Sequence, residues 1–309
     1  MEMSTHSLNH GSSLTLRVPG ENDPSHFAMV IGRGRGCTLK VTGPVAGVWI
    51  LLRGRLHLTE DETSTVLYPS DMRVTEFDNC MRAVGRGSAM WLALLGSEPA
   101  WREALAGSPK EFVLHPSILP STCTVDRSLR RRATELARVA MRGTRGDLEM
   151  VVNAIVDEIC DLQSPLDAAI ERCPGRSYSQ RRQVFLRLQR VRNYLAVNCH
   201  LELDNGMLAR MANYSPWQFI RAFSAAYQET PHAYLVTQRL LRARHLLGNT
   251  SLAINEIAVA CGFENPCAFS RLFRRRFMTT ATTVRREHTT AALYKNDLLV
   301  LGASTGLPN

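Results

Sequence analysis

Short apolar runs separated by turn-forming residues dominate the chain from Val30 to about Val113. From Val48 to Leu58, apolar and polar residues alternate with the period of two that is typical of a half-buried strand. The polar segment Thr59–Thr63 then predicts a hairpin loop. We expect the apolar face of this strand to line one protein interior; that face carries Val48, Ile50, Leu52, Leu56 and Leu58.

The spacing of apolar residues changes to a helical period near Arg127. Apolar residues at intervals of three and four predict two amphipathic helices, around 129–140 and 148–162. Pro165, Pro174 and Gly175 then indicate a linker. The expected organisation is a flexible arm at 1–25, a β-domain at 26–120, a helical packing or dimerisation region at 121–163, a linker at 164–177, an all-helical domain at 178–288 and a tail at 289–309.

An internal repeat with an offset of 50 residues marks the all-helical domain. The segment Phe219–Phe223 recurs as Phe269–Phe273, and each copy follows a capping residue and a proline, Ser215-Pro216 and Asn265-Pro266. A short apolar helix and a tight turn precede each cap. This order of elements predicts a helix-turn-helix, whose second helix can enter the DNA major groove. Thr230-Pro231 opens a helix that would connect the two copies.

Helical geometry divides each second helix into a core stripe and an outward face. The first core stripe consists of Phe219, Ala222, Phe223 and Ala226. The residues expected to read bases are Trp217, Ile220, Arg221, Cys267, Ser270 and Arg271. Those expected to meet phosphates are Gln218, Arg274, Arg275 and Arg276. Two alternatives stay open: Gln218 could instead close a capping box with Ser215, and Trp217 could belong to the core.

The distribution of charge supports this division of the chain. The 309 residues carry a net charge of +9, and the segment 176–287 holds 17 Arg, no Lys and 6 acidic residues. That segment therefore has a net charge of +11, whereas the remainder is at −2. A positive domain joined to a nearly neutral one is typical of a nucleic-acid binder with an attached sensor or assembly module. Because no apolar run approaches the roughly 18 residues that a membrane span requires, we expect a cytoplasmic, nucleoid-associated protein with no membrane partner.

The carboxy-terminal domain resembles the AraC/XylS family of bacterial transcription regulators over about residues 190–286. The matching residues of the connecting helix are Thr230-Pro231, Tyr234, Arg239, Ala243 and Leu246-Leu247. The matching residues of the second copy are Ile254, Ile257-Ala258, Gly262-Phe263 and Phe269–Arg275. The resemblance implies sequence-specific binding to promoter DNA through both helix-turn-helix units. We expect a transcription regulator with RNA polymerase as a partner, and we favour activation of transcription over repression. Three positions depart from the family pattern: Met278 and Asn213 replace glycines, and Val284 replaces an aromatic residue.

Residues 32–113 resemble the family's cupin-like sensing barrel, through Trp49–Leu58 and Tyr68–Met72. The expected fold class is therefore α+β: a cupin-like β-barrel with following helices, then an all-α domain of two helix-turn-helix units joined by a linker helix. The candidates for binding an anionic effector are Arg53, Arg55 and His57, although an exposed sheet face explains them equally well. The sequence leaves open whether a small molecule or a regulatory protein controls this domain, and whether the chain forms a homodimer.

The alternative function is a DNA-tethered enzyme, either a metal cupin or a cysteine alkyl acceptor. A metal cupin needs a cluster of histidines, and His57 stands alone on its strand. The eight cysteines are scattered, with no pair separated by two residues, which indicates reduced, buried thiols. We therefore expect no catalytic residue, no metal site and no cofactor.

Overall fold

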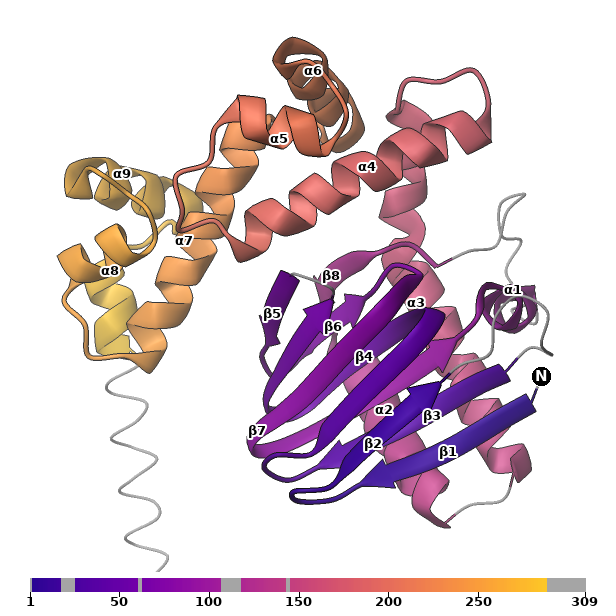
Figure 1. Cartoon of the computed structure of the whole chain (residues 1–309). Coiled ribbons are helices and arrows are strands. Elements are labelled where there is room, and N and C mark those ends of the chain that lie inside the picture. The colour runs from indigo at the N-terminus through magenta and orange to yellow at the C-terminus, as the bar shows by residue number, and fades with distance from the viewer. Residues whose placement is uncertain (1, 18–25, 61–62, 107–117, 143–144, 288–309) are drawn as a thin grey trace, which may run out of the picture. The chain divides into compact units, whose positions relative to one another are not determined.

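The computed structural model describes residues 2–17, 26–60, 63–106, 118–142 and 145–287, and it divides into two compact units, Met1–Gln189 and Arg190–Asn309 (Figure 1). Within the described residues, no helix is both long enough and apolar enough to span a bilayer.

A mixed β-sheet forms the first part of the first unit. Its strands in the described residues are β1 (Glu2–Leu8), β2 (Ser13–Arg17), β3 (His26–Arg33), β4 (Thr38–Glu60), β5 (Thr63–Leu67), β6 (Asp71–Val74), β7 (Asp78–Gly96) and β8 (Ser121–Thr124). The strand order is β1-β3-β7-β4-β6-β8, and β2 and β5 pair with β4 beside this path. With the helices that follow, this sheet confirms the α+β class.

The long strands β4 and β7 bend, so that each belongs to two layers. Val84 of β7 pairs with Thr38 at one end of β4 and with His57 near the other end. Register shifts interrupt β4, and Gly54 (φ 81°) lies within one of them. The predicted cupin-like barrel is not a closed ring, because the strand path runs from β1 to β8 and no pairing in the described residues joins these two ends. The bends fold one sheet over instead of closing a ring.

The bends also correct the predicted hydrophobic face. Val48 and Ile50 pack in a core shared with the helices, whereas Leu56 and Leu58 pack in a second core between the two layers of the sheet. A β-bulge inserts a residue and therefore reverses which side chains face a given core. The five apolar residues consequently do not share one interior, and the intervening Trp49 and Leu51 are also buried.

The predicted arm at 1–25 is wrong where the structure describes it. Residues 2–17 contribute two strands: β1 pairs in parallel with β3, and β2 pairs in parallel with β4. Leu8 is buried, and Leu14 and Leu16 pack against the core between the sheet layers. The polar residues here form the exposed half of strands that have one buried face. Residues 18–25 lie outside the described part of the chain.

The helices of the first unit are α1 (Glu98–Ala106), α2 (Arg127–Arg142) and α3 (Arg145–Arg172), and α2 and α3 cover one face of the sheet in Figure 1. Both predicted amphipathic helices are present. The linker predicted at 164–177 is mostly helical, because α3 continues through Pro165 to Arg172. The buried Gln163 anchors this region: its amide accepts from Leu119 N (3.1 Å) and donates to Leu119 O (2.7 Å).

Helix α4 (Tyr178–Val197) crosses the boundary between the units, and shorter helices follow in the second unit. They are α5 (Asn205–Met211), α6 (Pro216–Tyr227), α7 (Pro231–Asn249), α8 (Ile254–Ala260) and α9 (Pro266–Phe277), and residues 281–287 form a further helical turn. The tail predicted at 289–309 lies outside the described residues.

Candidate nucleic-acid interface

The first pair of helices, α5 and α6, meets at a tight turn. Asn213 adopts a left-handed conformation there (φ 56°), which asparagine tolerates better than most residues. Ser215 caps α6 by accepting from Gln218 N, and Pro216 occupies the first turn. The buried residues of α6 are those of the predicted core stripe: Phe219, Ala222, Phe223 and Ala226. The cap therefore sets where the helix begins, and the stripe sets which face remains outside.

The second pair, α8 and α9, repeats this geometry. Gly262 (φ 85°) makes the turn, and Asn265 caps α9 by accepting from the backbone N–H groups of Cys267 and Ala268. Phe269 and Phe273 are fully buried. The repeat also includes the ends of the recognition helices, because Gln228 and Met278 are both left-handed C-caps and lie 50 residues apart.

Helix α7 holds the two pairs in one unit. The Arg239 guanidinium donates to Cys199 O (2.7 Å) and to Leu201 O (2.9 Å), both in the segment before α5. The same guanidinium packs on Gly262, where an added Cβ would come within 3.0 Å of it. Arg192 of α4 stacks over Tyr227 and Tyr234, with its Cζ atom 4.8 and 4.6 Å from the ring centroids. These contacts fix α7 against the segment before α5 and against the turn between α8 and α9.

The outward face of α6 combines one large aromatic ring with one cation. Trp217 is 67% exposed, so it is not a core residue, and Arg221 Cζ lies 5.3 Å from its ring centroid. Ile220 is half-buried beside them. Gln218 does close the capping box with Ser215, and its Oε1 atom is used there. Only its Nε2 amino group is therefore available as a donor to a phosphate.

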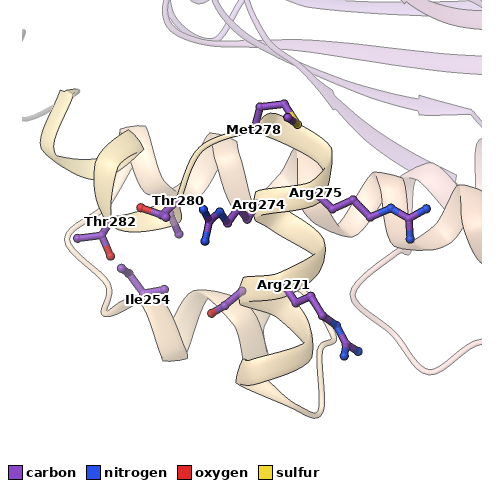
Figure 2. A pocket seen from close by; sticks show the side chains of 9 residues that line it. Ile254, Arg271, Arg274, Arg275, Met278, Thr280 and Thr282 are labelled. Atoms are coloured by element: carbon purple, nitrogen blue, oxygen red, sulfur yellow. The ribbon is translucent and has the colours of Figure 1, made fainter.

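The outward face of α9 is strongly basic and borders an open groove of about 770 Å³. Figure 2 shows Arg274 turned across the groove toward Thr280, whereas Arg271 and Arg275 extend away from it. Cys267, Ser270 and all four arginines of α9 are exposed. Arg276 differs from its neighbours because it is close enough to influence Glu229. Burial raises the pKa of the Glu229 carboxyl group, and the positive charges of Arg192 and Arg276 partly oppose that rise.

The residues predicted from the sequence do not include Thr280, which lines the groove and caps the 281–287 helix by accepting from Thr283 N (3.2 Å). The sequence contains a signal for it. Thr280 lies 50 residues after Thr230, which caps α7 by accepting from Ala233 N (3.1 Å). Extending the repeat past the recognition helices, from the cap already recognised at Thr230, would have identified Thr280.

The predicted effector residues lie on the outside of the sheet. Arg53 and Arg55 are exposed and His57 is half-buried, whereas the alternating Leu56 and Leu58 face the packed core. Burial and the charges of Arg86 and Arg55 lower the pKa of His57. In the part of the chain that the structure describes, no three His, Cys, Asp or Glu side chains are grouped to hold a metal ion.

Two capped recognition helices, joined by one helix that is fixed to both, define a double helix-turn-helix domain. Residues 208–287 match the family described as a helix-turn-helix domain. The chain is 38% identical over 68 residues to the transcriptional regulator CdhR of Pseudomonas aeruginosa, covering 22% of this chain and 20% of that protein. It is 44% identical over 57 residues to the transcriptional activator RhaS of an Enterobacter species, covering 18% of this chain and 20% of that protein.

Among solved structures, the chain is similar to the DNA-binding domain of AdpA in complex with a target DNA, at 30% identity and a TM-score of 0.32, covering 34% of this chain and 95% of that one. By the family match of residues 208–287, the second unit contains an AraC-type helix-turn-helix domain. The matched segment spans about a fifth of the length of the curated relatives.

Proposed function

We propose that the chain is a sequence-specific transcription regulator that binds promoter DNA through α6 and α9. The observation that carries this proposal is the repeated geometry of the two helices: each begins at an equivalent cap, buries an equivalent aromatic stripe and presents polar or cationic side chains on its free face. Helix α7 has 19 residues and is therefore about 28 Å long. That length suits two recognition helices in successive major-groove segments, about 34 Å apart.

The proposed contacts divide between bases and backbone. Bases would be read by Trp217, Ile220, Arg221, Cys267, Ser270 and Arg271. Ile220 can offer only apolar contact, such as with a thymine methyl group, whereas an arginine can bond both acceptors of guanine. Phosphates would be bound by Arg274 and Arg275, by the free amino group of Gln218, and by Arg276.

The proposed role is activation, with RNA polymerase as a partner and without enzymatic activity. The relative RhaS is named an activator, which supports this sign of regulation. The first unit would respond to a small molecule or a regulatory protein, either as a monomer or as a homodimer, and the protein would act in the cytoplasm on the nucleoid. Two dense cores fill the first unit, and Arg53, Arg55 and His57 lie outside them, so an effector that meets these residues would bind on the surface.

Selection from random DNA duplexes by the full chain, followed by footprinting, tests the proposal. We expect an enriched sequence with two protected segments about one helical turn apart. Arg221→Ala should relax selection in one segment and Arg271→Ala in the other. Arg138→Ala, at an exposed position of α2, is the matched control and should change neither. Absence of enrichment, or relaxation of the same segment by both variants, would overturn the proposal.

A further inference from the structure

One outer face of the folded sheet carries an accumulation of positive charge. It is formed by β2, the two ends of β4, the first half of β7 and β5, whose hydrogen-bonded partners place them side by side. Its exposed cations are Arg17, Lys40, Arg55, Arg82 and Arg86. We call this surface the basic sheet face.

Like charges stand directly opposite each other on this face. Lys40 pairs with Arg82 across β4 and β7, and Arg55 pairs with Arg86. Side chains at such positions are close neighbours, and like charges there disfavour the folded state. His57 lies between the two pairs along the strand, and it is near enough to Arg55 and Arg86 for their charges to act on it.

In the described residues, no ion pair balances the paired cations of this face. These strand segments contain two acids in the described part of the chain: Asp78, at the start of β7, and Glu60. Glu60 is buried and bound to Arg73 through Nε–Oε1 (2.9 Å) and Nη2–Oε2 (3.2 Å). Within the same described residues, neither Lys40 nor Arg82 has an ion pair. Like-charge pairs that disfavour the folded state, and that have no ion pair within the described residues, point to an external counter-charge.

The chemistry of the face favours an acidic polypeptide over other anions. The cations are exposed on a sheet surface, whereas small-molecule sites are concave. Single-stranded nucleic acids need aromatic stacking platforms, and the described outward residues between the cations are Thr38, His57, Thr59 and Val84. A duplex groove of about 12 Å admits a helix or a two-stranded ribbon but not a broad sheet.

An extended acidic segment fits the spacing of the basic sheet face. Alternate side chains of such a segment point to one side, about 7 Å apart, so its carboxylates can meet cations on neighbouring strands. Arginine forks bind carboxylates through two parallel hydrogen bonds. We propose that the basic sheet face is a docking surface for an Asp- and Glu-rich segment of a partner protein. The proposal concerns the first unit alone and does not depend on DNA binding by the second.

Binding of a fluorescein-labelled decaglutamate peptide to the full chain, followed by anisotropy, tests the proposal. Lys40→Glu with Arg82→Glu should weaken peptide binding at least tenfold. Arg131→Glu with Arg138→Glu, an equal charge change at exposed positions of α2, should weaken it less than twofold. Binding of the peptide by the second unit should be the same in the native chain and in both variants, because all four substitutions lie in the first unit. Equal weakening by both pairs of substitutions would overturn the proposal.

Two further measurements distinguish docking of an acidic peptide from binding of other anions and from a folding defect. In parallel titrations with a 20-base-pair duplex and with vesicles of anionic phospholipid, the Lys40 and Arg82 substitutions should change affinity less than twofold. A larger loss for either ligand than for the peptide would overturn the choice of partner. Lys40→Gln with Arg82→Gln should leave the melting temperature unchanged or raise it, because a like-charge pair is removed. A lower melting temperature would show that the cations have internal partners and would refute the proposal.

Discussion

Arg271 and Arg275 provide the most direct test of the division between base and phosphate contacts. Both side chains are exposed on α9 and extend away from the groove, as Figure 2 shows. Neither is buried, so replacing either with alanine removes no core packing. The two variants should therefore differ in DNA binding and not in folding.

The expected magnitudes follow from the two kinds of contact. Loss of a bidentate arginine–guanine contact in Arg271→Ala should reduce discrimination between cognate and mismatched duplexes by about 1–3 kcal/mol. Loss of one phosphate contact in Arg275→Ala should weaken binding to all sequences similarly. It should also reduce the slope of log affinity against log salt by about 0.9. Between 50 and 200 mM salt, that smaller slope corresponds to about 3.5-fold less loss of affinity than for the native chain.

Anisotropy titrations with a selected duplex and with a duplex mutated in the α9 segment, each at four salt concentrations, measure both quantities. Arg138→Ala on α2 removes an exposed arginine elsewhere and serves as the control. If Arg271→Ala and Arg275→Ala lost the same discrimination and had the same salt slope, the assignment of roles on α9 would be refuted.

Three further predictions concern stability and reactivity. Arg73→Ala should lower the free energy of unfolding by about 3–5 kcal/mol in urea titrations, because it leaves the buried Glu60 carboxylate without its partner; a loss below about 1 kcal/mol would contradict this. Met278→Gly should raise the free energy of unfolding by about 1 kcal/mol, because Met278 adopts the left-handed φ of 55°, which glycine adopts without strain, and its 87% exposed side chain loses little packing. A lower melting temperature for this variant would show that the left-handed conformation carries no such strain. At pH 8, iodoacetamide should label the exposed Cys267 and spare Cys261, since burial raises the pKa of Cys261 to about 11 and keeps its thiol protonated. A cognate duplex should protect Cys267, and mass spectrometry that found equal labelling with and without DNA would argue against a base contact there.

The local features of the second unit were predictable from sequence, because their causes are local. Ser215 and Asn265 cap the helices that follow them, and the spacing of Phe219 and Phe223 determines which side of α6 is buried. The apolar contacts of α7 were less predictable. Leu246-Leu247 match the family pattern and Leu247 is buried, but Leu240, which belongs to no recognised pattern, is buried as well.

The fold of the first unit was less predictable, because its determinants are distant in sequence. Whether Leu56 shares a core with Val48 depends on a bulge near Gly54, and the bulge becomes evident only when β4 is paired with β7. Pro165 predicts a linker, but helix α3 continues through it. The neighbouring Gln163 is bonded to Leu119, which is 44 residues away in the sequence, and such a contact cannot be predicted from local signals. The same limitation hid the like-charge pairs of the basic sheet face, since Lys40 and Arg82 become neighbours only in the folded sheet.

The two recognition helices share a backbone design and differ in surface chemistry, and this difference has a consequence for DNA binding. Helix α6 presents Trp217 and Ile220 with one arginine, whereas α9 presents four arginines. Because counterion release scales with the number of phosphate contacts, α9 should supply most of the salt-dependent affinity. Helix α6 can then contribute mainly selectivity, through apolar contacts that are insensitive to salt. At rising salt, protection of the α9 segment should therefore weaken together with overall affinity, while the base preference in the α6 segment should persist for as long as binding is measurable.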